Sequence, residues 1–172
     1  MSSLDMTPRS LYLPLFAACA LVSAFGCGKP SQGVCNLLLP DDVAPIVGGS
    51  PMRSDDGPTC GWAGGGRWFG ITLLGANRRA VDGGSAYDYL RRQYGAQDEP
   101  TVADTACSYW SKKAFRIMVL DQGQLVMFAV KRNGNEMQRD SIAYRERLRD
   151  EVRPLAKKAL SALRQRGPAS TK

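Results

Sequence analysis

The sequence predicts an α+β domain in which helices pack on an antiparallel sheet of about five strands. Short runs rich in aromatic and β-branched residues alternate with glycine-bearing turns, as strands of a meander do. Two other segments carry apolar residues at helical spacing. No strand–helix–strand rhythm runs through the chain, so a parallel sheet is not indicated. The expected order of elements is α-β-β-α-β-β-β-α.

The first helix is expected over residues 40–47. Proline suits the first position of a helix, because its missing N–H needs no partner there. Asp41 and Asp42 fall in the first turn, where negative charge interacts favourably with the helix dipole. Gly48 and Gly49 end the helix.

Five strands are expected where aromatic and β-branched residues concentrate. Their predicted ranges are 59–63, 67–74, 105–110, 114–120 and 124–131. The last two form a hairpin around a turn that contains Gly123. The segments 50–58 and 97–104 are rich in turn-forming residues and are expected to be loops.

A second helix is expected over residues 85–94. Ser85 and Asp88 have the spacing of a capping box, and Gly95 is a typical C-terminal stop. This helix separates the second predicted strand from the third.

The last helix is expected to begin at a cap on Asp140 and to pack one face on the sheet. Its apolar residues recur in steps of three and four, at Leu148, Val152, Leu155, Ala159 and Leu163. Pro154 lies inside this stripe and predicts a kink or a break into two helices.

The first 27 residues have the pattern of an export signal. A polar stretch with Arg9 precedes an apolar run over residues 11–25, which is too short to span a membrane, and small residues lead to Cys27. This ending resembles the lipobox of bacterial lipoproteins, in which the cysteine thiol is diacylated and the signal is cut just before it. The resemblance implies a signal peptide over residues 1–26, a lipid on Cys27 and a tether over residues 27–33.

The rest of the chain suits one domain, expected over residues 34–166 with a frayed tail at 167–172. Of the 172 residues 44% are hydrophobic, which is enough for a real core, and no second apolar stretch approaches membrane-spanning length. We therefore expect a protein of the cell envelope, held by its lipid on the periplasmic or outer surface of a membrane.

Export would place the remaining cysteines, Cys35, Cys60 and Cys107, in an oxidising compartment, where a disulfide is expected. The residues alone leave all three pairings open. A cysteine just before a helix, a glycine that ends the helix, and a second cysteine two residues before Trp62 resemble a family of small exported lipoproteins, common in actinobacteria, with a domain of unknown function. The resemblance covers residues 34–165 and implies that Cys35 pairs with Cys60. It implies no activity.

Catalysis is not indicated. The chain contains no histidine, which excludes Ser-His-Asp and Cys-His catalysis and removes the commonest zinc ligand. The glycine cluster at 64–70 matches no phosphate-binding spacing and predicts a hairpin turn. Three pairs of adjacent carboxylates are expected to be solvated turns, because neighbouring side chains rarely converge on one site. These pairs are Asp41-Asp42, Asp55-Asp56 and Asp98-Glu99. We expect no enzyme, no cofactor and no metal site.

The net charge of +7 comes from the last quarter of the chain. There Arg145, Arg149, Arg153 and Lys157 recur every four residues, and we expect them to point to solvent while the apolar stripe faces the sheet. They would form either a solvated outer face or a docking surface for phospholipid headgroups, envelope polyanions or an acidic protein. Export makes nucleic acid an unsuitable partner.

These patterns predict a lipid-anchored, non-catalytic protein with a binding or scaffolding role at the envelope. One alternative is a carrier that holds an apolar ligand between the sheet and the last helix, and another is an inhibitor or immunity protein. A deep apolar pocket under the last helix would favour the carrier, whereas a filled core would favour the binding role.

Overall fold

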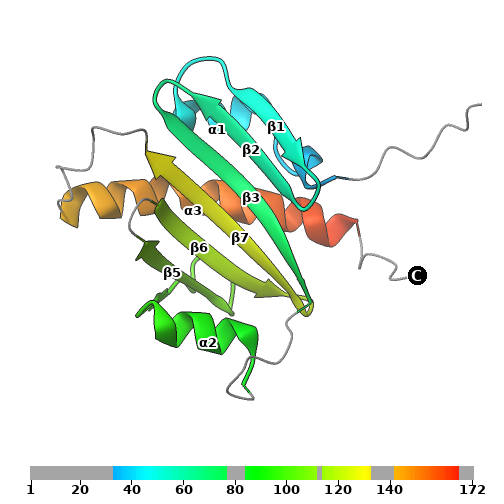
Figure 1. Ribbon diagram of the computed structural model, residues 1–172, viewed down its shortest axis with the longest axis vertical. Helices are drawn as coiled ribbons and strands as arrows, with labels where there is room; N and C mark the ends of the chain where they lie inside the picture. The colour runs from blue at the N-terminus through cyan, green and yellow to red at the C-terminus, as the bar shows by residue number, and fades with distance from the viewer. Residues whose placement is uncertain (1–32, 77–83, 112–113, 133–141, 167–172) are drawn as a thin grey trace, which may run out of the picture. The chain divides into compact units, whose positions relative to one another are not determined.

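A computed structural model describes residues 33–76, 84–111, 114–132 and 142–166, and all of them belong to one compact unit. Within these residues the fold is α+β, as predicted, and is built on a seven-stranded antiparallel sheet with the strand order β1-β2-β3-β7-β6-β5-β4 (Figure 1). The strands are β1 (Met52–Asp56), β2 (Thr59–Gly64), β3 (Arg67–Ala76), β4 (Gln97–Asp98), β5 (Ala106–Ser111), β6 (Ala114–Asp121) and β7 (Gln124–Arg132). The helices are the 3-10 turn η1 (Val34–Asn36), α1 (Pro40–Val47), α2 (Ala86–Gln93) and α3 (Ile142–Gln165).

The two strands that the sequence did not predict, β1 and β4, form the two edges of the sheet. Every residue of both is exposed, so neither carries the alternation of apolar and polar residues that marks a half-buried strand. β1 pairs with β2 from Met52 opposite Ala63 to Asp56 opposite Thr59. The segments 50–58 and 97–104 are therefore not loops throughout, because sheet pairing overrides their turn-like composition.

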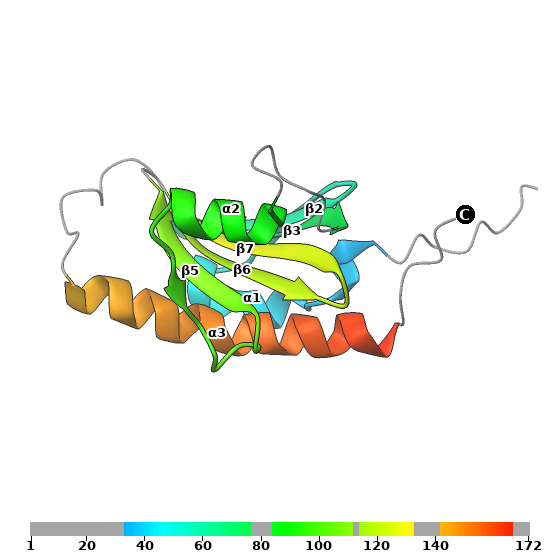
Figure 2. The ribbon, with the colours of Figure 1, turned by 90° about the horizontal axis from the view of Figure 1, so that it is seen from below.

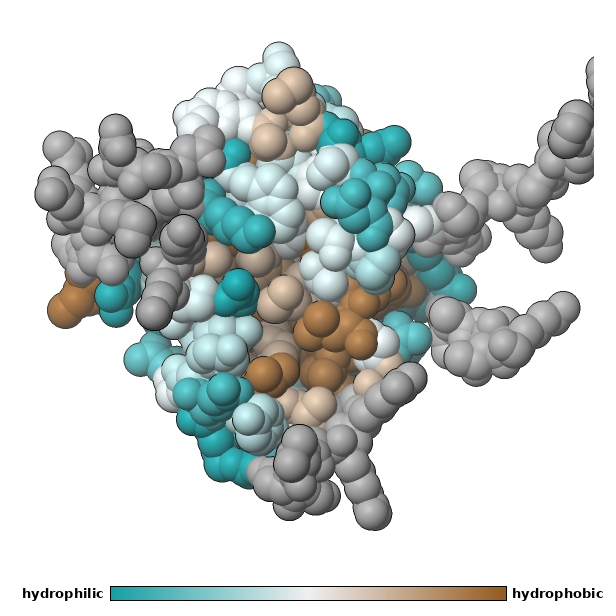
Figure 3. Space-filling model, in the orientation of Figure 1, coloured by the Kyte–Doolittle hydropathy of each residue, from teal (hydrophilic) through white to brown (hydrophobic). Residues whose placement is uncertain are grey.

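Helices cover both faces of the sheet (Figure 2). α1 and α3 lie on one face, and α2 lies on the other over β5 and β6. The larger core fills the α1–α3 face. Residues spaced by two along the central strands point into it: Phe69, Ile71, Phe115, Ile117, Val119, Val126, Phe128 and Val130. A smaller cluster under α2 takes residues that point to the opposite face, among them Tyr87, Cys107 and Met118. Figure 3, which views this α2 face, shows apolar side chains gathered over the sheet beside α2.

The stripe predicted on the last helix faces the sheet. Leu148, Val152, Leu155 and Ala159 are buried, and Leu163 packs against the same core. The predicted break at Pro154 is wrong, because α3 continues from Ile142 to Gln165 without interruption. Proline costs about 3 kcal/mol inside a helix. Here Pro154 is exposed while its neighbours Val152 and Leu155 are buried, so packing of the inner face holds the helix together. The predicted cap at Asp140 lies outside the described residues.

The glycine cluster after β2 forms the predicted hairpin turn, with Gly65 and Gly66 at φ 23° and 102°. Gly64 has a second role in packing. A Cβ on Gly64 would lie 2.3 Å from the carbonyl oxygen of Gly48, at the end of α1. The absence of a side chain therefore lets α1 approach the β2–β3 hairpin.

The disulfide implied by the resemblance is present. Cys35 in η1 bonds to Cys60 in β2, with 4.9 Å between their Cα atoms and a separation of 25 positions in sequence. Both cysteines are buried in the larger core, and Cys107 is a buried free thiol under α2. The bond holds the start of the domain against the sheet. No helix among the described residues is long and apolar enough to cross a membrane.

Candidate functional site

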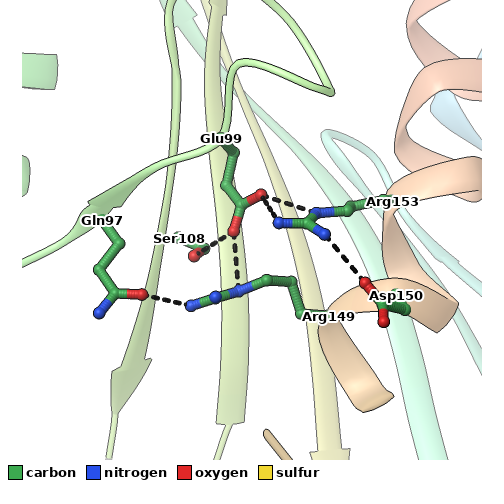
Figure 4. A network of polar contacts seen from close by, with 6 residues as sticks. All are labelled: Gln97, Glu99, Ser108, Arg149, Asp150 and Arg153. Atoms are coloured by element: carbon green, nitrogen blue, oxygen red, sulfur yellow. Dashed lines mark hydrogen bonds and ion pairs between the residues drawn. The ribbon is translucent and has the colours of Figure 1, made fainter. Parts of the chain in front are cut away.

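A buried carboxylate, Glu99, organises the edge of the sheet at β4 (Figure 4). Glu99 is the residue after the end of β4 and is 0% exposed. Its backbone N–H donates to the carbonyl oxygen of Ala106 at 2.8 Å. The hydroxyl of Ser108, from β5, donates to Glu99 Oε1 at 2.7 Å. Burial of a carboxylate is costly unless it is paired and hydrogen-bonded, so its partners must be held in place.

Two arginines from α3 supply that pairing. Arg149 Nε lies 2.9 Å from Glu99 Oε1, and Arg153 Nη2 lies 2.7 Å from Glu99 Oε2. Arg153 Nε donates a hydrogen bond to Glu99 Oε2 at 2.8 Å, whereas the contact of Arg149 Nε with Glu99 is an ion pair without hydrogen-bond geometry. Arg149 Nη2 donates to Gln97 Oε1 at 2.5 Å, and Arg153 Nη1 donates to Asp150 at 2.9 Å. One carboxylate thus joins two successive turns of α3 to the β4–β5 edge.

This network corrects two predictions. Asp98 is in an exposed ion pair with Arg91, as expected for a solvated carboxylate, but Glu99 is fully buried. Arg149 and Arg153 do not point freely to solvent, because their side chains are 23% and 29% exposed and bind Glu99. The sequence could not show that Glu99 pairs with Arg149 and Arg153, because an ion pair between positions about fifty residues apart leaves no local pattern in the sequence.

Other charged residues of α3 also bind the domain itself. Glu151 pairs with Arg67 from β3 at 3.3 Å. Lys158 contacts Asp42 of α1 at 2.6 Å, and this hydrogen bond lowers the pKa of the Asp42 carboxyl. In the last turn of α3, Arg164 makes a bidentate contact with Asp121 of β6. Arg166, the residue after α3, donates to the carbonyl oxygens of Gly33 and Asn36. Together with Arg149 and Arg153, these residues attach α3 to the rest of the domain.

Two of the four predicted docking residues, Arg145 and Lys157, are exposed on the surface of α3. Lys157 is exposed. Arg145 is exposed as well, and its guanidinium carbon lies 5.4 Å from the centre of the Trp110 ring. Anionic-surface docking by the four predicted residues stays a prediction, and it now depends on these two.

A pocket of about 430 Å³ opens beside the Glu99 network. Its lining includes Tyr94, Ser108, Tyr109, Trp110, Ile142, Arg145 and Arg149. Tyr94 directly follows α2, and the α3 residues belong to its first two turns. Ser108 is the β5 residue opposite Gln97 of β4, and Tyr109 and Trp110 lie beyond that pairing. Volumes of 300–1,000 Å³ are typical of ligand pockets.

The walls of this pocket are aromatic and charged. Tyr94 and Tyr109 stack with ring centroids 4.6 Å apart and 9° between their planes. Burial raises the pKa of Tyr109 above its ordinary value. Arg149 forms part of the wall and is fixed there by Glu99 and Gln97. The pocket offers stacking surfaces and guanidinium groups, and the hydroxyl of Ser108 in its lining is hydrogen-bonded to Glu99. Among the described residues, no cluster of three or more potential ligands could hold a metal ion.

Cys107, which is buried under α2, is expected to make the fold less stable at alkaline pH. Burial raises the pKa of the Cys107 thiol in the folded state. As pH rises past the ordinary thiol pKa of about 8.5, the unfolded chain releases this proton first, so unfolding becomes more favourable. We expect the free energy of unfolding to fall between pH 7.5 and 9.5. Urea titrations across this range would measure it. The variant Cys107→Ala should lack the decline, and an equal decline in both proteins would contradict the assignment.

Comparison of the chain with protein-family models, with curated proteins and with solved structures finds no match. The resemblance to exported lipoproteins therefore stays a prediction from the residues. The predicted lipidation residue, Cys27, lies outside the described residues.

Proposed function

We propose that this chain is an exported, lipid-anchored protein without catalytic activity, which binds a partner in the cell envelope. The observation that carries the location is the apolar export pattern ending at Cys27. The disulfide between Cys35 and Cys60 supports it, because such bonds persist in oxidising compartments. The observation that favours binding is the pocket at the β4–β5 edge, whose wall is fixed by a buried ion-pair network.

The carrier alternative has less support. The space between the sheet and α3 is filled by large, fully buried side chains, including Phe69, Phe115, Phe128 and Leu148. A carrier would need room for its apolar ligand at this interface. The inhibitor or immunity role is a special case of partner binding and would use the same pocket.

The anchor is tested by the variant Cys27→Ser. We expect the wild-type chain to partition with membranes and its mature terminus to be a diacylated cysteine. In the variant the lipid cannot be attached, and the protein should appear in the soluble envelope fraction. Fractionation and mass measurement of the amino terminus decide this. A mature wild-type protein that begins at another residue, without lipid, would contradict the proposal.

A further inference from the structure

Among the described residues, the sheet ends in the full-length strand β1 at one edge and in the short strand β4 at the other. β4 has two residues, and the side chain of Asp98 there is paired with Arg91 from α2. β1 has five residues, all of them exposed. It is the outermost strand, whereas α1 packs on β2 and β3 (Figure 1). An exposed edge of this kind is a template for pairing with a strand of another chain.

Two residues of β1 direct their backbone groups toward the open edge. A two-residue turn joins β1 to β2, and Asp56 and Thr59 lie opposite each other on either side of it. In such a hairpin the residues that flank the turn bond to each other, and the direction of the backbone groups alternates along each strand. Ser54 and Asp56 therefore bond to β2. The N–H and C=O groups of Arg53 and Asp55 point away from it.

The side chains of Arg53 and Asp55 carry opposite charges on the same face of the sheet. Their register partners in β2 are Trp62 and Cys60, which are both buried in the larger core, so Arg53 and Asp55 lie on the α1–α3 face. Arg53 makes no ion pair with any part of the chain that the structure describes. Asp55 accepts the Gly57 N–H at 3.3 Å through Oδ1, which leaves Oδ2 for a further partner.

These two charges make the strand complementary to itself in one register. When two copies of β1 pair antiparallel about a two-fold axis at Ser54, Arg53 of each copy lies opposite Asp55 of the other. The outward backbone groups of these residues then bond across the interface, and an ion pair forms on each side of the axis. An axis at Arg53 or at Asp55 would instead place like charges opposite each other, which is unfavourable. The charges therefore select one register.

We infer that β1 is a homodimer interface, at which two copies of this chain join their sheets edge to edge. β1 contributes five residues, whereas a standard interface has about 20–30 residues on each side, so the dimer is weak and reversible. The net charge of +7 comes from residues 131–172, and β1 itself carries one basic and two acidic residues. The β1 edge is also the opposite edge of the sheet from the pocket, so the inference goes beyond the proposed binding function and does not depend on it.

A disulfide between the two copies of β1 would test the register. Ser54 of one copy faces Ser54 of the other in a pair without backbone hydrogen bonds, in which the Cα atoms are about 4.5 Å apart, within the range of a disulfide. We expect the full chain with Ser54→Cys, in neutral detergent, to form a covalent dimer on mild oxidation, seen on a non-reducing gel. The wild type gives the background from its own cysteines.

The matched control is Asp56→Cys, on the same exposed strand and the same face as Ser54. In the inferred register the two copies of this residue are separated by four positions along the strand, about 13 Å, which is too far for a disulfide. Asp56→Cys should therefore stay at the wild-type background. Equal cross-linking of Ser54→Cys and Asp56→Cys would show random collision, and no cross-linking of Ser54→Cys would show that β1 does not pair. Either result would overturn the inference.

Charge reversal separates this interface from any other. In the Ser54→Cys protein, Arg53→Asp places aspartates opposite each other, and Asp55→Arg places arginines opposite each other. Each variant alone should cross-link about tenfold more slowly, because both attractive pairs become repulsive. A mixture of the two variants should cross-link again, as a heterodimer recognised by its mass, since every facing pair then has opposite charges. This recovery would also show that both variants are folded. Variants that cross-link alone as fast as Ser54→Cys, or a mixture that does not recover, would contradict the inferred dimer.

Discussion

Replacement of Glu99 by glutamine is expected to destabilise the fold by about 3 kcal/mol. Glu99 is fully buried and binds both Arg149 and Arg153 at less than 3 Å. Without the carboxylate, two guanidinium groups remain partly buried with no anion between them, and this uncompensated charge is the main cost. The two side chains keep 23% and 29% exposure, which places the effect at the lower end for a broken buried pair.

Urea unfolding of the variant and the wild type would measure the effect. Asp150→Asn is the matched control, because Asp150 binds Arg153 from the surface with its side chain 70% exposed. Such surface pairs contribute only about 0–1 kcal/mol. The triple change Glu99→Leu, Arg149→Met and Arg153→Met should recover part of the lost stability, since it removes the charges together. A Glu99→Gln protein as stable as the wild type would show that the network contributes little to folding.

Loss of the Cys35–Cys60 disulfide is expected to cost a similar amount. The bond spans 25 residues of sequence, and the chain-entropy estimate for a loop of that length is about 3 kcal/mol. A reductant should therefore shift the urea midpoint of the wild type downward. The double variant Cys35→Ala, Cys60→Ala should have the lower urea midpoint without any reductant, and addition of the reductant should not change that midpoint.

Cys107→Ala provides the control, because Cys107 is a free thiol and its replacement leaves the disulfide intact. This variant should respond to the reductant as strongly as the wild type does. If reduction leaves the wild-type midpoint unchanged, the disulfide does not stabilise the fold by restricting the unfolded chain.

Local signals in the sequence were sufficient for most of the elements. α1 spans Pro40–Val47, as its terminal proline and the glycines after it predict. The two strands of the β6–β7 hairpin lie within one residue of their predicted ends, because aromatic and β-branched residues and a glycine turn mark them. The apolar stripe of α3 identified the face that packs on the sheet. In each case the signal lies within a few residues along the chain.

The candidate site lacked such signals. In the sequence Glu99 looks like half of a solvated acidic pair, and only α3 brings Arg149 and Arg153 against it, from 50 and 54 residues away. The aromatic rings of Tyr94 and Trp110 belong to segments that meet only when β5 and α3 are in place. Polar edge strands such as β1 also depend on a neighbour, since β2 supplies the hydrogen bonds. Propensity and periodicity act along the chain and therefore specify helices, turns and buried strands. Charge pairing and pocket shape depend on distances between remote residues, which only the assembled sheet and α3 set.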